Sequence, residues 1–105
     1  MRCRAYRGRG LVEGVARGPA LVVRGRVSFL GDVDPERGVL RLSSGPAGLA
    51  GRVLVVEGGR GSTVGSYVIY GLARRGLAPA AMVVVEAEPI IVAGCVLGGI
   101  PLVSG

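Results

Sequence analysis

The sequence predicts a mixed α/β domain in which a barrel-like sheet carries one principal helix. Residues 53–56 form a continuous apolar run of the kind found in buried parallel strands, and a helix-like segment and a second apolar run, residues 82–85, follow it. This strand–helix–strand order implies a right-handed crossover between neighbouring parallel strands. In the first half of the chain, short β-branched runs alternate with glycine and arginine, which indicates antiparallel strands joined by tight turns.

Each segment of the first half has its own signal. Four apolar, mostly β-branched runs are predicted to be short strands, at residues 11–15, 20–23, 27–30 and 39–42. Residues 31–38 are predicted to be an acidic turn, because their Asp34-Pro35 pair favours a reversal of the chain. Residues 43–51 are mainly small residues and are predicted to be a loop.

In the second half, the helix-like segment has one apolar side, where residues recur at a spacing of four: Val64, Val68 and Leu72. Arg74 and Arg75 fall in its last turn, where cations complement the helix dipole, and a glycine and a proline at positions 76 and 79 mark its end. Residues 90–97 could form a strand or a short helix, and periodicity does not decide between them. Residues 100–103 are predicted to close the domain as a strand.

The residue types that the chain lacks exclude most self-contained catalytic sites. It has no His, Lys, Trp, Asn or Gln. Without His there is no Ser–His or Cys–His pair and no imidazole ligand for a metal, and without Lys there is no Schiff base. Two cysteines, Cys3 and Cys95, cannot supply the thiolates that a zinc or iron–sulfur site normally takes. We therefore expect no metal on this chain, and we expect a partner to bring most of any chemistry.

The charge and hydropathy of the chain limit the classes of partner that it can have. All 13 basic residues are arginines and the net charge is +6, so nucleic acid is the first partner class to consider. Aromatic residues make up 4% of the chain, and the aromatic stripe that single-strand binding uses is missing, so we expect no nucleic acid partner. The longest uncharged stretch, residues 89–105, is broken by glycines and a proline and is too short to cross a membrane. No secretory signal is recognised, so we expect a cytoplasmic protein without membrane contact.

A glycine-rich turn between the first buried strand and the predicted helix is the candidate site: Gly58-Gly59-Arg60-Gly61-Ser62-Thr63. Its glycines permit positive φ angles and the close approach of a ligand. Ser62 falls at or near the helix N-cap, where free backbone N–H groups favour a carboxylate, a phosphate or a serine alkoxide, and Arg60 adds a positive charge. A serine that is only a helix cap would leave the same pattern.

Five motifs occur in order along nearly the whole chain: Gly31-Asp32-Val33-Asp34, Gly58-Gly59-Arg60-Gly61-Ser62, Pro79-Ala80-Ala81, Glu88-Pro89-Ile90-Ile91 and Gly98-Gly99-Ile100-Pro101-Leu102-Val103. With these motifs the chain resembles the small subunit of the aconitase X family. The resemblance implies a free-standing aconitase-type swivelling domain with a β/β/α barrel-like fold, which covers residues 1–105 as a single domain. This implied fold agrees with the architecture predicted from the pattern.

The resemblance also implies an activity, that of a hydro-lyase whose small subunit works only with a large subunit. The large subunit is implied to hold a four-iron four-sulfur cluster, so no cofactor is expected on this chain. The implied reaction dehydrates (R)-5-phosphomevalonate to trans-anhydromevalonate 5-phosphate in an archaeal mevalonate pathway. Ser62 is implied to be the proton acceptor, and Arg60, Gly61 and Thr63 are expected to contact the small anionic substrate. An apolar surface around residues 90–103 is expected to help dock the large subunit.

Three alternatives stay open at this point. The chain could belong to a related aconitase X hydro-lyase that acts on a hydroxyproline. It could be a basic barrel that binds nucleic acid, with an affinity that falls steeply as salt rises. It could also be a non-catalytic assembly module, in which Ser62 would only cap a helix.

Overall fold

The computed structural model describes residues 9–12, 18–61 and 64–104. Its strands are β1 (Arg9–Val12), β2 (Ala20–Val27), β3 (Val33–Asp34), β4 (Val39–Leu42), β5 (Gly45–Gly48), β6 (Val53–Gly59), β7 (Ala81–Val84) and β8 (Leu102–Ser104). Its helices are α1 (Val64–Arg74) and α2 (Pro89–Gly98).

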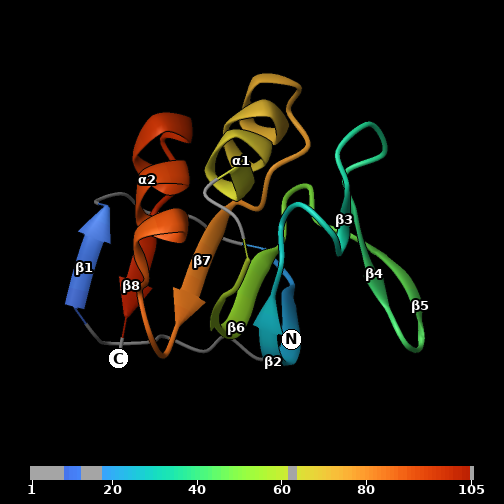
Figure 1. Cartoon of the computed structure of the whole chain (residues 1–105), viewed down its shortest axis with the longest axis horizontal. Coiled ribbons are helices and arrows are strands. Elements are labelled where there is room, and N and C mark those ends of the chain that lie inside the picture. The colour runs from blue at the N-terminus through green and yellow to red at the C-terminus, as the bar shows by residue number, and fades with distance from the viewer. Residues whose placement is uncertain (1–8, 13–17, 62–63, 105) are drawn as a thin grey trace.

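A five-stranded sheet in the order β1-β8-β7-β6-β2 forms the body of the molecule (Figure 1). Strands β2, β6, β7 and β8 run parallel to one another, and β1 pairs antiparallel with β8 at one edge. Helix α1 connects β6 to β7 and α2 connects β7 to β8, so each connection moves the chain by one strand. Right-handed crossovers in one direction put both helices on the same face of the sheet. There α1 and α2 pack against each other, and strands β3, β4 and β5 form a small antiparallel sheet beyond the β2 edge.

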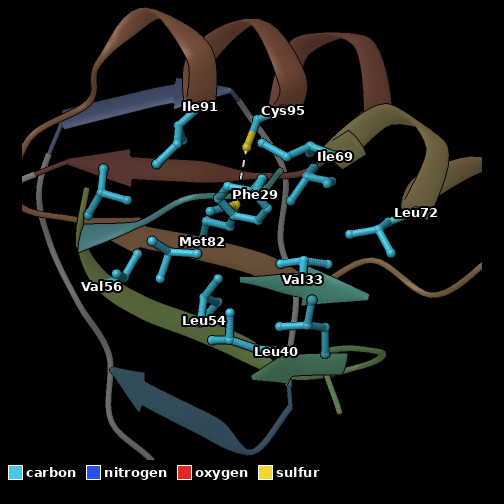
Figure 2. Close-up of a cluster of buried hydrophobic side chains, with 14 of the residues drawn as sticks. Phe29, Val33, Leu40, Leu54, Val56, Ile69, Leu72, Met82, Ile91 and Cys95 are labelled. Carbon is cyan, nitrogen blue, oxygen red and sulfur yellow. Dashed lines mark hydrogen bonds between the residues drawn. The ribbon is translucent and has the colours of Figure 1, made fainter. Parts of the chain in front are cut away.

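The core lies between the large sheet and the two helices (Figure 2). Its central members are buried side chains of β6, β7, α1 and α2: Leu54, Val56, Met82, Val84, Ile69, Leu72, Ile91 and Cys95. Phe29 lies among these side chains, and Val33 and Leu40 continue the cluster into the small sheet. The predicted strand at residues 53–56 is fully buried on one face only, because Val53 and Val55 on its other face are half-exposed.

The single strand β2 lies where two strands, at residues 20–23 and 27–30, were predicted. Residues 20–27 run continuously through Gly25, which has a φ of 93°, and the register with β6 shifts between Val23 and Arg26. This shift is a β-bulge. The prediction of a strand at residues 27–30 is wrong, because the chain turns after Val27 and closes the turn with a bond from the Asp32 N–H to the Ser28 carbonyl at 2.7 Å. The expected antiparallel first half is also wrong for β2, which pairs parallel with β6.

The remaining differences in the first half lie around the small sheet. The predicted loop at residues 43–51 contains β5, which pairs antiparallel with β4. The predicted acidic turn at residues 31–38 contains the two-residue strand β3, and Asp34 closes the turn that follows. Its Oδ1 accepts hydrogen bonds from the Arg37 and Glu36 N–H groups at 3.2 and 3.0 Å. The Arg37 bond, with further help from the Arg41 and Arg37 charges, holds the pKa of Asp34 below its usual value. Residues 13–15 of the predicted first strand lie outside the described residues.

The undecided segment at residues 90–97 belongs to a helix, α2, so two helices of similar length cover the sheet. Pro89 at the first helical position and Gly99 in the left-handed conformation (φ 66°) bound α2. Periodicity did not reveal it because its sequence is apolar all round. Within the described ranges, neither helix has the length and apolar character that a membrane crossing requires.

Candidate active site

The candidate site lies at the edge of the large sheet where its parallel strands end. Strand β6 ends at Gly59 and α1 begins at Val64. In open α/β sheets, ligands bind outside the carboxyl ends of the strands. Of the predicted site residues, Arg60 and Gly61 are described, whereas Ser62 and Thr63 lie outside the described residues. Residues 58–61 are called the glycine turn below.

The loop after β2 contacts the far end of the glycine turn. The Arg60 N–H donates to the Val27 carbonyl at 3.0 Å, and the Arg60 guanidinium lies 3.3 Å from Asp32 Oδ2. The same Asp32 oxygen accepts the Ser28 N–H at 2.9 Å. Gly61 has a φ of 97°, and a Cβ added there would lie 3.1 Å from Ser28 Oγ. The turn therefore needs glycine at position 61, both for its conformation and for its contact with Ser28.

The near end of the glycine turn contacts Arg26. Its Nη1 donates to the Gly59 carbonyl at 3.2 Å, and its Nη2 lies 2.5 Å from Glu86 Oε2, in the segment after β7. A Cβ on Gly58 would lie 2.9 Å from Arg26 Nη1 and 2.9 Å from the Glu86 carbonyl oxygen. The sequence pattern suggested that this glycine admits a ligand. In the structure it admits the guanidinium of Arg26.

The Glu88 carboxylate occupies the space beside Gly59, as the Arg26 guanidinium does beside Gly58. It is the N-cap of α2, and its carboxylate accepts the Ile90 and Ile91 N–H groups at 3.1 and 2.9 Å. A Cβ on Gly59 would lie 2.5 Å from Glu88 Oε1 and 3.1 Å from Ile91 Cδ1. The first amides of α2 thus bind the chain's own carboxylate, and Gly59 leaves room for it.

Arg60 is the cation of the glycine turn, and its side chain is accessible to a ligand. Its side chain is 59% exposed, and the Asp32 side chain with which it pairs is 31% exposed. Exposed ion pairs of this kind contribute only about 0–1 kcal/mol to stability. A substrate carboxylate or phosphate can therefore replace Asp32 at little cost, which is the chemistry expected of a substrate-binding arginine.

A family model for the aconitase X swivel domain matches residues 5–105. The chain belongs to this family. Among curated relatives, the phosphomevalonate dehydratase small subunit of Aeropyrum pernix is 56% identical over 100 residues, which cover 95% of this chain and 73% of that protein. The protein of the same name from Methanothrix thermoacetophila is 55% identical, over 87% of this chain and 69% of that one. The protein of that name from Pyrococcus furiosus is 49% identical, over 94% and 76%.

Solved structures agree with this membership. The crystal structure of Thermococcus kodakaraensis aconitase X in its holo-form superimposes with a TM-score of 0.88 at 46% identity, over 93% of this chain and 77% of that one. A solution NMR structure superimposes with a TM-score of 0.85 at 42% identity, over 94% and 76%. The predicted mixed α/β swivelling fold is thereby confirmed, with α2 added to the one helix that the pattern assigned.

The described part of this swivel domain offers no set of ligands for an iron–sulfur cluster. Among those residues, no three His, Cys, Asp or Glu side chains come together in a way that could hold a metal ion. Cys95 lies in the core beside Met82, with their sulfur atoms 3.5 Å apart. Burial raises the pKa of its thiol to about 12, so the thiol is protonated at neutral pH.

Cys95 is expected to resist alkylation by iodoacetamide at pH 8 in the folded swivel domain and to react once the chain is unfolded in guanidinium. The pKa of the folded thiol lies above its usual value of 9.0, so the stability that the neutral thiol contributes is present below about pH 9 and is lost as the pH rises toward 12. Mass spectrometry of the peptide that contains Cys95 measures the reaction. Rapid labelling of the native domain at pH 8 would contradict the buried position.

Three residues of the site, Arg26, Asp32 and Glu88, were not assigned a site role from the sequence. Each contacts the glycine turn from a distant part of the chain: Arg26 and Gly59 are 33 residues apart, and Asp32 and Arg60 are 28 apart. No local spacing signals such contacts. Glu88 could have been found as a cap, because a proline at the first helical position follows it.

Proposed function

We propose that this swivel domain is the small subunit of a hydro-lyase that dehydrates (R)-5-phosphomevalonate to trans-anhydromevalonate 5-phosphate. The observation that carries the proposal is the set of relatives named phosphomevalonate dehydratase small subunit, which are 49–56% identical over 87–95% of this chain. We further propose that the 105 residues form one swivelling domain and that the protein works in the cytoplasm.

Ser62 is the proposed proton acceptor, and its neighbours support that role. It follows Gly61 directly in sequence, and the glycine turn before it is bonded to the loop after β2. Helix α1 begins two residues later, so the positive end of the helix dipole favours a serine alkoxide at this position. The alkoxide would remove the proton next to the substrate carboxylate as the hydroxyl on the adjacent carbon leaves. Arg60, Gly61 and Thr63 would contact the substrate, with Arg60 binding one of its anionic groups.

In this proposed complex, a large subunit holds the four-iron four-sulfur cluster, and this chain binds no cofactor. Helix α2 is the proposed docking surface for that subunit. It carries no charged residue, yet Val96 and Leu97 are 59% and 54% exposed. Ser66, Pro89, Ile90 and Ala93 line a hollow of about 210 Å³ between the helices. Exposed apolar patches of this kind mark interaction surfaces. Within the expected docking region of residues 90–103, the side chains of Ile91, Cys95, Ile100 and Leu102 are buried and unavailable to a partner.

Turnover of two substrates side by side tests the proposed reaction. The chain is co-expressed with its large subunit and purified without air, and the complex receives either 5-phosphomevalonate or a hydroxyproline. We expect the complex to dehydrate the phosphorylated acid and to leave the hydroxyproline unchanged. Preference for the hydroxyproline would assign the chain to the related hydro-lyase. No dehydration of either, combined with salt-sensitive retention on nucleic acid by the chain alone, would favour the nucleic-acid-binding alternative.

A further inference from the structure

We propose that Arg26 is a positioning residue that fixes the glycine turn for the proton transfer proposed above. The inference rests on that proposed function and concerns a residue outside the substrate contacts already named. One guanidinium joins the ends of three neighbouring parallel strands: Arg26 belongs to β2, the Gly59 carbonyl to β6, and the Glu86 carboxylate to the segment after β7. Through these contacts, Arg26 links Gly59, the last residue of β6, to the ends of β2 and β7 on either side of it.

Arg26 and its neighbour Val27 hold opposite ends of a single peptide group. The carbonyl of the Gly59–Arg60 peptide accepts a bond from Arg26 Nη1 at 3.2 Å. The N–H of the same peptide donates to the Val27 carbonyl at 3.0 Å. Because peptide groups are planar, bonds at both ends fix the rotation of the whole unit. That rotation sets the direction in which the chain continues through Gly61 toward residue 62.

The backbone around Arg26 is built to bring its guanidinium to this point. The β-bulge in β2, with Gly25 at a φ of 93°, brings Arg26 into register with Gly58. Bulges recur beside active sites, where they redirect a side chain. Gly58 has no side chain, and the Arg26 guanidinium occupies the space that a Cβ would need. Gly25 and Gly58, more than thirty residues apart, thus both allow the contact between Arg26 and the glycine turn.

Stability does not account for this arrangement. The Arg26 and Glu86 side chains are 38% and 64% exposed, and half-exposed ion pairs contribute little to folding. The planar fork of arginine lets one side chain contact a carbonyl and a carboxylate together, which the single ammonium of lysine does not reproduce. A role in fixing the turn therefore predicts that lysine at this position changes the reaction more than the stability.

The test compares Arg26→Lys with Arg24→Lys, a matched change at an exposed arginine on the same strand. In the assembled complex, Arg26→Lys is expected to lower kcat about 10- to 100-fold and to leave KM within about threefold, because misplacement of a catalytic group costs rate rather than binding. In the free chain, the Arg60 amide is expected to exchange its hydrogen faster, with little change in Tm. Glu86→Gln, which removes the carboxylate anchor, should shift both readouts in the same direction by less. Arg24→Lys should match the unmodified protein.

Hydrogen exchange at the Arg60 amide measures how firmly the glycine turn is held, and it does not depend on which reaction the complex performs. Unchanged exchange at Arg60 in Arg26→Lys would overturn the proposal, even if the complex proved inactive on 5-phosphomevalonate and the proposed function failed. Faster exchange with unchanged kcat would show that the contact has no part in catalysis. A raised KM with unchanged kcat would make Arg26 a substrate-binding residue, which also contradicts positioning.

Discussion

Replacement of Ser62 by alanine is expected to lower turnover of the assembled two-chain complex by at least about 10²- to 10⁴-fold. A positioned acid or base contributes a factor of that size, and the chain contains no histidine or lysine that could take over. Assembly should be spared, since the change removes one oxygen atom. Product formation by equal amounts of purified complex measures the effect, with size-exclusion chromatography to confirm that both chains are present.

Two other serines provide the comparison. Ser44 is exposed between β4 and β5, and Ser44→Ala should leave turnover unchanged. Ser66 lies four residues after position 62 in the sequence; it is buried in α1 and lines the hollow between α1 and α2. A collapse of the rate in Ser66→Ala combined with near-normal turnover in Ser62→Ala would move the proton acceptor to Ser66 and overturn the present assignment.

Replacement of Gly94 by alanine is expected to destabilise the fold by about 1–3 kcal/mol, the usual cost of overpacking a core. Gly94 lies where α2 crosses α1, and an added Cβ would lie 2.7 Å from Ile69 Cδ1 and 2.8 Å from Ile69 Cβ. Ile69 is fully buried and its Cβ cannot move without α1, so the two helices must separate. In a domain of this size, each kcal/mol lowers Tm by roughly 4–8 °C. Thermal unfolding followed by circular dichroism measures the shift.

Gly71→Ala in α1 is the matched control for Gly94→Ala. A Cβ added at Gly71 has no neighbouring atom within 4 Å. Alanine there should raise stability by about 0.5–1 kcal/mol, because glycine is a poor helix former. Equal effects at the two positions would contradict the close approach of α1 and α2 at Gly94.

The sequence predicted the part of the fold that local patterns specify. The β6–α1–β7 unit was predictable because the apolar pattern changes from strand to helix and back between Val53 and Val84. Helix α2 was not, since a helix that is apolar all round has no period. Strand β5 consists of glycine, proline and alanine, and its pairing with β4 is a tertiary contact that its composition does not signal. The parallel pairing of β2 with β6 is likewise set by the whole sheet.

At the site, the sequence predicted the location of the turn but not what holds it. Three glycines between a strand and a helix indicated the turn, and Arg60 stood out as its cation. The partners of the turn are Arg26, Asp32 and Glu88, which reach it from the ends of other strands. Because those contacts depend on which strands are neighbours, they become visible only once the sheet order is known.

Separate and combined assays of the two polypeptides address the central claim, that a serine of this small chain completes a reaction which its larger partner cannot perform unaided. Each is purified without air and given 5-phosphomevalonate, first singly and then mixed. The account predicts trans-anhydromevalonate 5-phosphate from the mixture alone. Formation of that compound by the larger polypeptide in isolation, at the rate of the mixture, would contradict it.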